Sequence, residues 1–159
     1  MPEFSKFFCY EMKLTMKKIE RYMTQRLDEY GVNFTQSLVL FCLMEQNGQT
    51  LSEVGIMAQI ENSSLTSMSD KLERMGLVEK RSDARNRRVV KLFITPLGRV
   101  VGKKIFSLGL EFNQHLLSKL GELQASLKQS LDIINETVIE EIERYSTGLK
   151  NIPSSNLGR

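Results

Sequence analysis

Residues 77–95 have the sequence LVEKRSDARNRRVVKLFIT, in which two short apolar runs flank a polar and basic segment. Val, Leu and Phe favour extended strands, and two such runs joined by a longer polar loop predict a β-hairpin. Residues 79–91 contain six Lys or Arg and two acids, a net charge of +4. The whole chain carries +3, so everything outside this segment sums to −1. A cationic hairpin on an otherwise nearly neutral chain indicates contact with a polyanion.

The composition limits the classes of protein to consider. The chain has 159 residues, 41% of them hydrophobic, which suffices for one domain with helical extensions. No apolar run approaches the roughly 18–20 residues of a membrane span, and the N-terminus does not resemble a signal peptide. We therefore expect a cytoplasmic protein without a membrane partner. Cys9 and Cys42 lie outside any CxxC or Cys/His cluster, so we expect free thiols, no metal and no cofactor. We expect no enzyme, because the sequence offers no nucleophile–base pair and no glycine-rich phosphate loop.

Apolar residues at helical spacing predict long helices on both sides of the hairpin. Residues 5–30 lack Gly and Pro and are expected to form one helix that stops at Gly31. After the hairpin, Thr95-Pro96 predicts the start of a long helix, which Gly121 should break. Residues 123–145 then continue the apolar stripe. These stripes exceed what one small domain can cover, and they predict a homodimer with interlocking terminal helices.

Three shorter helices are expected between the first long helix and the hairpin. Thr35 is expected to cap the first of them. Thr50 and Glu53 have the spacing of a capping box that opens the second. Residues 62–64 are expected to cap the third, which should stop at Gly76. Two short helices followed directly by a basic hairpin are typical of a winged helix-turn-helix.

The sequence therefore predicts a mainly α fold with a small wing of two to three β-strands. A winged helix-turn-helix domain is flanked by long N- and C-terminal dimerisation helices. The expected segments are an N-terminal dimerisation helix, the winged helix-turn-helix domain, C-terminal dimerisation helices and a flexible tail, over residues 1–34, 35–95, 96–150 and 151–159.

Three motifs resemble the MarR family of bacterial and archaeal transcriptional regulators. Residues 63–78, SSLTSMSDKLERMGLV, resemble the family's recognition helix and the start of its wing. Residues 83–88, DARNRR, resemble its wing motif, and residues 94–98, ITPLG, resemble the start of the next helix. The resemblance implies a homodimer that binds a palindromic operator in double-stranded DNA, represses transcription and releases the DNA when a small ligand binds. Ser67 and Asn86 depart from the family pattern, in which Arg and Asp are frequent.

The expected DNA contacts combine this resemblance with side-chain chemistry. Short hydroxyl side chains near a helix N-terminus allow close approach to base edges and phosphates. An arginine of the wing can enter a minor groove, and Arg87 or Arg85 is the expected residue. The recognition helix is expected to contact DNA through Ser63, Ser64, Thr66, Ser67 and Lys71. The wing is expected to do so through Arg81, Arg85, Asn86, Arg87 and Arg88. Phosphate contacts are expected from Thr35, Gln36 and Ser52.

Each of these surfaces has an alternative interpretation. The hydroxyl-rich helix face could be an ordinary solvent-exposed face. The basic loop could be solvated, with its cations paired to acids elsewhere in the chain. We disfavour that alternative for the loop because Glu79 and Asp83 are too few to balance six cations.

Two further sites are expected to control DNA binding. The resemblance implies a pocket for a small aromatic or lipophilic effector between the dimerising helices and the DNA-binding lobe. Its expected lining is Phe8, Met12, Met16, Phe34, Leu38 and Phe41. Ordinary core packing is the alternative for these residues. Cys9 lies about where peroxide-sensing members of the family carry their reactive cysteine. The alternative function is therefore a thiol-based, redox-sensing regulator, unless Cys9 is simply a small buried hydrophobe.

Overall fold

The computed structural model describes residues 3–83, 86 and 89–150, with side chains described up to residue 147. The chain divides into two compact units, Met1–Phe112 and Asn113–Arg159. Each unit is described by itself below. The predicted tail, residues 151–159, lies outside the described residues.

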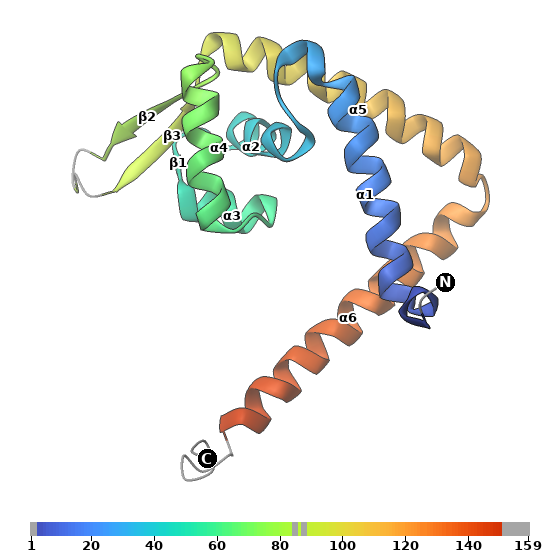
Figure 1. Cartoon of the computed structure of the whole chain (residues 1–159). Coiled ribbons are helices and arrows are strands. Elements are labelled where there is room, and N and C mark those ends of the chain that lie inside the picture. The colour runs from blue at the N-terminus through green and yellow to red at the C-terminus, as the bar shows by residue number, and fades with distance from the viewer. Residues whose placement is uncertain (1–2, 84–85, 87–88, 151–159) are drawn as a thin grey trace. The chain divides into compact units, whose positions relative to one another are not determined.

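The first unit consists of helices and a small sheet (Figure 1). Its N-terminal part contains the 3-10 helix η1 (Glu3–Lys6), α1 (Phe8–Arg26) and the 3-10 helix η2 (Asp28–Tyr30). The central part contains α2 (Phe34–Glu45), β1 (Gln49–Thr50), α3 (Leu51–Ala58) and α4 (Asn62–Arg74). The hairpin and the following helix are β2 (Val78–Ser82), β3 (Val90–Ile94) and α5 (Pro96–Leu120), which ends in the second unit.

The sheet has three antiparallel strands in the order β1-β3-β2. Strands β2 and β3 pair from Val78 opposite Ile94 to Ser82 opposite Val90, so the hairpin opens outward from a buried base. The short strand β1 pairs Gln49 with Leu92 on the other edge of β3. The predicted fold class, mainly α with a small β-wing, is confirmed.

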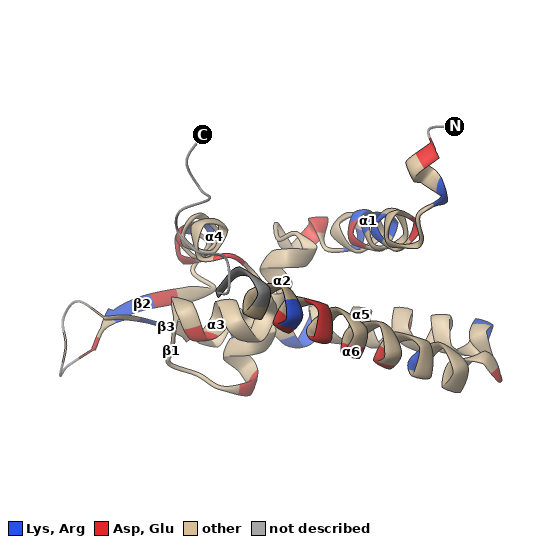
Figure 2. Ribbon diagram, turned by 90° about the horizontal axis from the view of Figure 1, so that it is seen from below, with Lys and Arg blue, Asp and Glu red and all other residues tan. Residues whose placement is uncertain are grey.

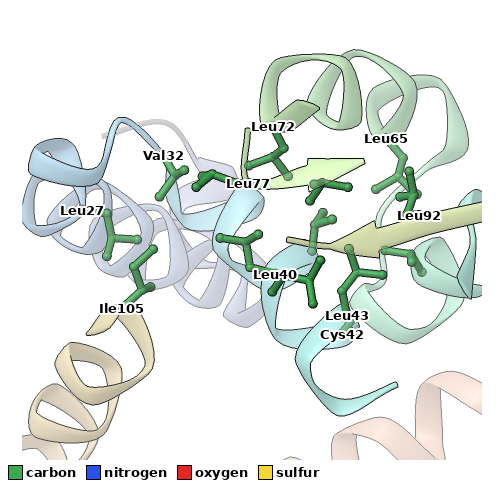
Figure 3. Close-up of a cluster of buried hydrophobic side chains, with 14 residues drawn as sticks. Leu27, Val32, Leu40, Cys42, Leu43, Leu65, Leu72, Leu77, Leu92 and Ile105 are labelled. Carbon is green, nitrogen blue, oxygen red and sulfur yellow. The ribbon is translucent and has the colours of Figure 1, made fainter. Parts of the chain in front are cut away.

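One hydrophobic core joins the helices to the base of the hairpin (Figure 3). Helix α2 is apolar on most sides and contributes Leu40, Cys42 and Leu43. Leu72 of α4 and Leu92 of β3 are fully buried in the same cluster. Each fully buried side chain of this size contributes about 1.5–3 kcal/mol, so this contact fixes α4 against the sheet. Cys42 is a free thiol in this core, and burial raises the pKa of its thiol.

Several predicted helix boundaries are confirmed. The Thr50 side chain accepts a hydrogen bond from the Glu53 amide at 3.2 Å, and the Thr50 amide donates to Glu53 Oε2 at 2.7 Å. Gly76 follows α4 with a φ of 68°, and Gly121 separates α5 from the last helix with a φ of 53°. Both values lie in the left-handed region that favours glycine. Thr95 caps α5, because its hydroxyl accepts a hydrogen bond from the Gly98 amide at 2.9 Å.

The predicted start of α2 was wrong. Asn33 caps this helix in place of Thr35, and Gln36 completes the capping box. The Gln36 amide donates to Asn33 Oδ1 at 2.8 Å, and the Asn33 amide donates to Gln36 Oε1 at 3.0 Å. The pair Asn33 and Gln36 therefore satisfies two amides at once. Thr35 could not do this, because it is already the second residue of the helix.

Two other predicted boundaries were also wrong. The N-cap of α4 is Glu61, without a capping hydrogen bond from its side chain, and not a residue of the 62–64 segment. The single helix predicted for residues 5–30 is shorter, because α1 ends at Arg26. The Leu27 amide bonds the carbonyl oxygens of both Met23 and Thr24, which tightens this last turn before η2.

The second unit contains the C-terminal end of α5 and helix α6 (Leu123–Lys150). Large apolar side chains are exposed along α6 at three- and four-residue steps. They include Leu123, Leu127, Leu131, Val138, Ile142 and Tyr145. Among the described residues, no helix combines the length and apolar character needed to cross a bilayer.

The contact between α5 and the base of the hairpin leads to a first prediction. A Cβ atom at Gly98 would overlap the carbonyl oxygen of Leu77, a backbone atom that cannot rotate away. Gly98→Ala should therefore destabilise the protein by about 1–3 kcal/mol, measured by urea unfolding. Gly109→Ala is the matched control in the same helix, where a Cβ meets no atom within 4 Å. This control should gain about 0.5–1 kcal/mol. Equal effects of the two substitutions would contradict the close approach at Gly98.

The capping box of α3 leads to a second prediction, on pH. Hydrogen bonds from the Thr50 amide and hydroxyl hold the pKa of the Glu53 carboxyl below its usual value. The carboxylate therefore stabilises the fold above its unfolded-state pKa, and this contribution is lost as the pH falls through the folded-state pKa. Glu53→Gln keeps a hydrogen-bonding group but removes the charge. It should lower the free energy of unfolding at pH 7, and its difference from wild type should shrink between about pH 5 and pH 3.

The control for this experiment is Glu111→Gln on α5, an exposed position without a hydrogen bond or ion pair to the described residues. This variant should have the same free energy of unfolding as the wild type at pH 7 and down to about pH 3. A difference between Glu53→Gln and wild type that keeps its size at low pH would show that the charge of Glu53 does not act through the cap.

Candidate nucleic-acid interface

Helices α3 and α4 form a tight helix-turn-helix next to the hairpin (Figure 1). The turn between them contains Gln59 in a left-handed conformation, with a φ of 54°. Gly55 lets α3 approach the start of α4 closely, because a Cβ there would lie 2.9 Å from the Ile60 carbonyl oxygen. The short turn therefore fixes the start of α4 against α3, and α4 leads directly into strand β2.

The predicted recognition surface lies on the exposed side of α4. Leu65, Ser69 and Leu72 are buried beneath it. The five predicted contact residues, Ser63, Ser64, Thr66, Ser67 and Lys71, are all exposed. The helix thus presents short polar side chains over its first two turns.

Two of these hydroxyl groups already donate hydrogen bonds within α4. Thr66 Oγ1 donates to the Asn62 carbonyl oxygen at 3.2 Å, and Ser67 Oγ donates to the Ser64 carbonyl oxygen at 2.9 Å. Their outward-facing lone pairs remain able to accept hydrogen bonds. In this arrangement Thr66 and Ser67 offer acceptors to a ligand, such as the amino groups that adenine and cytosine expose in a major groove.

The three predicted phosphate contacts have different surroundings. Ser52 is exposed in the first turn of α3, and Thr35 is half-buried in the first turn of α2. The Gln36 side chain is only 4% exposed and completes the α2 capping box. Its Oε1 also accepts from Lys71 Nζ at 3.4 Å. This geometry argues against a phosphate contact by Gln36 and gives the side chain a structural role instead.

The tip of the wing is closed by hydrogen bonds around Asp83. The Asp83 amide donates to the Val89 carbonyl oxygen at 2.8 Å, and the Val89 amide donates to the Asn86 carbonyl oxygen at 2.9 Å. Asp83 Oδ1 accepts from the Asn86 amide at 3.2 Å, and Asp83 Oδ2 lies 2.8 Å from Lys91 Nζ. Asp83 is therefore a structural residue of the wing.

The predicted wing contacts are only partly described. Arg81 is exposed, forms an ion pair with Glu79, and lies over the Phe93 ring with its guanidinium carbon 4.6 Å from the ring centre. Asn86 is also exposed. The other predicted wing contacts, Arg85, Arg87 and Arg88, lie outside the described residues.

The charge count that favoured a free cationic loop needs correction. Lys80 does not pair with an acid of the wing but with Asp70 and Glu73 of α4. Figure 2 shows acidic positions on α4 and basic positions on β2. Counting only acids between residues 79 and 91 missed these partners, because they precede the hairpin in sequence. Among the six cations of the segment, Lys80, Arg81 and Lys91 have carboxylate partners in the described residues.

The pairing with Lys80 perturbs Asp70. The hydrogen bond and positive charge of Lys80 hold the pKa of the Asp70 carboxyl below its usual value. Neither Asp70 nor Glu73 was among the predicted site residues. The period-two alternation along β2 could have revealed the pairing, because it puts Lys80 on the same side as buried Val78, the side that faces α4.

The six residues predicted to line the effector pocket differ in their exposure. Phe8 and Met16 are exposed on α1, whereas Met12, Phe34, Leu38 and Phe41 are partly buried. Phe41 packs edge-to-face on Phe106 of α5, with ring centres 5.6 Å apart. The pocket remains a prediction.

Cys9 is exposed in the first turn of α1. The interpretation of Cys9 as a small buried hydrophobe was therefore wrong, since the side chain does not enter the core. Its position at the start of α1 lies before the part of the helix that joins the core at Met23.

Comparison with known proteins finds a family model that is similar to part of the chain. Residues 32–90, which include α2, the helix-turn-helix and β2, match the MarR family model. The transcriptional repressor MdtR of Bacillus subtilis is 25% identical over 96 residues, which cover 60% of this chain and 62% of MdtR. The match thus spans less than two thirds of MdtR.

Two further similarities extend beyond the helix-turn-helix. The transcriptional regulator SarZ of Staphylococcus aureus is 22% identical over 132 residues, covering 82% of this chain and 84% of SarZ. The S. aureus MepR–DNA complex has the same fold, with a TM-score of 0.73 at 20% identity over 87% of this chain and 99% of MepR. Both relatives are described as HTH-type transcriptional regulators. Together, these matches show that residues 32–90 resemble the MarR family model and that the chain has the fold of MepR.

Proposed function

We propose that this chain is a winged helix-turn-helix transcriptional regulator of the MarR family. It would bind a palindromic operator in double-stranded DNA as a homodimer, repress transcription and release the DNA when a small ligand binds. It would act in the cytoplasm, where it meets chromosomal DNA. In each subunit, α4 enters a major groove and the wing tip lies in or beside the adjacent minor groove. The proposed base or phosphate contacts of α4 are Ser63, Ser64, Thr66 and Ser67. Lys71 is the proposed contact of α4 to the DNA phosphate backbone. The proposed wing contacts are Arg81, Arg85, Asn86, Arg87 and Arg88.

The observation that carries this proposal is the exposed hydroxyl face of α4 directly beside a basic hairpin. The buried side of α4 fixes the helix, and its exposed side consists of side chains short enough for close approach to base edges. The same arrangement of elements occurs in MepR, which is similar in fold and was crystallised with DNA. Ser52 and Thr35 remain proposed phosphate contacts at the starts of α3 and α2.

Exposed apolar side chains on α5 and α6 support the homodimer. Leu97, Val100 and Phe106 are exposed on α5, and Leu131 and Ile142 are exposed on α6. Isolated exposed apolar residues are ordinary, but a stripe repeated along a helix of 28 residues indicates an interface. A symmetric dimer covers such stripes with the same surface of a second copy and gives two copies of α4 for a palindrome. Segments 1–34 and 96–150 are the proposed dimerisation helices.

Control by a small aromatic or lipophilic ligand is supported by partly buried apolar side chains on α1 and α2. Phe41 and Phe34 lie on α2, and Met12 lies on α1. The two winged helix-turn-helix domains of the proposed homodimer can be arranged in a DNA-bound and a DNA-free state. A ligand that binds better to the DNA-free state would weaken DNA binding by population shift.

Selection of bound DNA from random duplexes tests the proposal directly. The selected sequences should contain two inverted half-sites with centres about 10 bp apart, one helical turn of DNA. Affinity for the selected operator should fall steeply with salt. Recovery of single, unpaired half-sites would contradict the homodimer, and no enrichment over random DNA would contradict specific binding.

A variant with Arg85, Arg87 and Arg88 replaced by Ala tests the wing. It should bind the operator at least about tenfold more weakly at physiological salt. The slope of log affinity against log salt concentration should become shallower by about two to three. Lys103, Lys104 and Lys119 replaced by Ala in α5 provide a control of equal charge change. This control should leave the affinity near that of wild type. An unchanged affinity of the wing variant would remove the wing from the interface.

The second candidate function, a thiol-based redox regulator, is favoured by the exposure of Cys9. Peroxide would oxidise the Cys9 thiolate to a sulfenic acid and would itself be reduced to water. Mild peroxide should then release the operator from wild type but not from Cys9→Ser. Mass spectrometry should locate the added oxygen on Cys9, with buried Cys42 as the internal control. Release that persists in Cys9→Ser would exclude this function for Cys9.

A further inference from the structure

Lys80 lies on the side of strand β2 that faces helix α4. Side chains alternate across a strand, so Lys80 shares a side with Val78, while Glu79 and Arg81 share the opposite side. Val78 is buried in the core, and the Lys80 side chain is only 21% exposed. The ammonium group of Lys80 therefore lies between the strand and the recognition helix and does not project from the wing.

Three contacts connect Lys80 to α4. Its Nζ donates a hydrogen bond to Asp70 Oδ1 and lies 3.9 Å from Glu73 Oε2. Its backbone amide donates to Glu73 Oε1 at 3.0 Å. The two carboxylates lie three residues apart, on neighbouring turns of α4. They bind the side chain and the main chain of the same residue, and this fixes the position of β2 along the helix as well as its distance from it.

We propose that Lys80 is a positioning residue that clamps strand β2 to α4, so that the wing and the recognition helix meet DNA as one unit. This proposal rests on the DNA-binding function proposed above. A wing that moved independently would add similar contacts to any duplex. A clamped wing adds its contacts only where α4 has found a fitting major groove, because the two elements then have a fixed separation. Lys80 thus contributes to the preference for operator over random DNA.

The next residue of the same strand provides a matched comparison. Arg81 carries the same charge as Lys80 but lies on the opposite side of the strand. It pairs with Glu79 and lies over Phe93, and both partners belong to the sheet. Arg81 is therefore expected to act as an ordinary phosphate contact, whereas Lys80 acts through α4.

The experiment measures affinity for the selected operator and for random duplex over a range of salt concentrations. Lys80→Met should weaken operator binding roughly three- to tenfold, leave random-duplex binding nearly unchanged and keep the wild-type salt dependence. Asp70→Asn should lower the same preference, although it removes an anion and not a cation. The double variant should be no worse than either single variant, and Lys80→Arg should restore the preference. Arg81→Met should instead weaken binding to both DNAs alike. It should also make the slope of log affinity against log salt concentration shallower by about one.

Two results would overturn the clamp. If Lys80→Met behaves like Arg81→Met, Lys80 is a phosphate contact. If Lys80→Met and Asp70→Asn both keep the wild-type preference, the clamp has no role in recognition. Thermal unfolding of each variant separates loss of fold from loss of recognition, and Lys80→Arg keeps the test valid if Lys80→Met unfolds. Failure of the wild type to bind any duplex, even at low salt, would contradict the proposed function itself and is therefore distinguishable.

Discussion

The side chain of Thr95 holds together the point where the recognition helix, the wing and α5 meet. Its hydroxyl donates to the Gly76 carbonyl oxygen at 2.6 Å, just beyond α4, and accepts from the Gly98 amide at 2.9 Å, in the first turn of α5. Its amide donates to the Leu77 carbonyl oxygen at 3.1 Å. This close junction is sterically open only because Gly98 lacks a Cβ. The directions of α4, the hairpin and α5 are therefore fixed by one cluster of hydrogen bonds from the hydroxyl and amide of Thr95 to the surrounding backbone.

From this junction outward, the hairpin becomes progressively less dependent on the core. Its base, Val78 and Ile94, is buried with α4 and α5. Its middle is held on the α4 side by the ion pairs of Lys80, whereas Arg81 on the other side forms an exposed pair with Glu79. Further out, the carboxylate of Asp83 accepts a hydrogen bond from the Asn86 amide and pairs with Lys91. Hydrophobic burial thus fixes the base, whereas charge pairing sets the course of the strands toward the tip.

The cations of this segment consequently divide into two kinds. A cation that faces α4 is compensated by carboxylates and contributes to the geometry of the site. A cation on the opposite side of the strand remains available to a polyanion, even where it has a neighbouring acid, because an exposed pair contributes little and exchanges partners readily. A net charge alone cannot distinguish these two kinds, although both contribute equally to the +4 of residues 79–91.

Much of the site could be predicted from the sequence, although its partners could not. The exposed face of α4 is where helical periodicity predicted it, since Leu65 and Leu72 bury the opposite side. Gln36 was predicted to contact a DNA phosphate, and Lys80 was only counted among the six cations of residues 79–91. Gln36 is instead engaged with Asn33, three residues away, and an Asn-x-x-Gln pattern was available in the sequence as a signal. The partners of Lys80 precede the hairpin and lie on another element, so a local count of charges could not include them.

The sequence by itself determined the features that depend on a few neighbouring residues. These are the capping box at Thr50, the helix end at Gly76, the helix start at Thr95 and the break at Gly121. Each depends on hydrogen bonds or backbone angles within about four residues, so the local sequence contains the whole interaction. Only the tertiary structure decided that Cys9 is exposed and that Lys80 faces α4. Those outcomes depend on which elements approach each other, and that approach is set by burial of the shared core rather than by the residues adjacent in the chain.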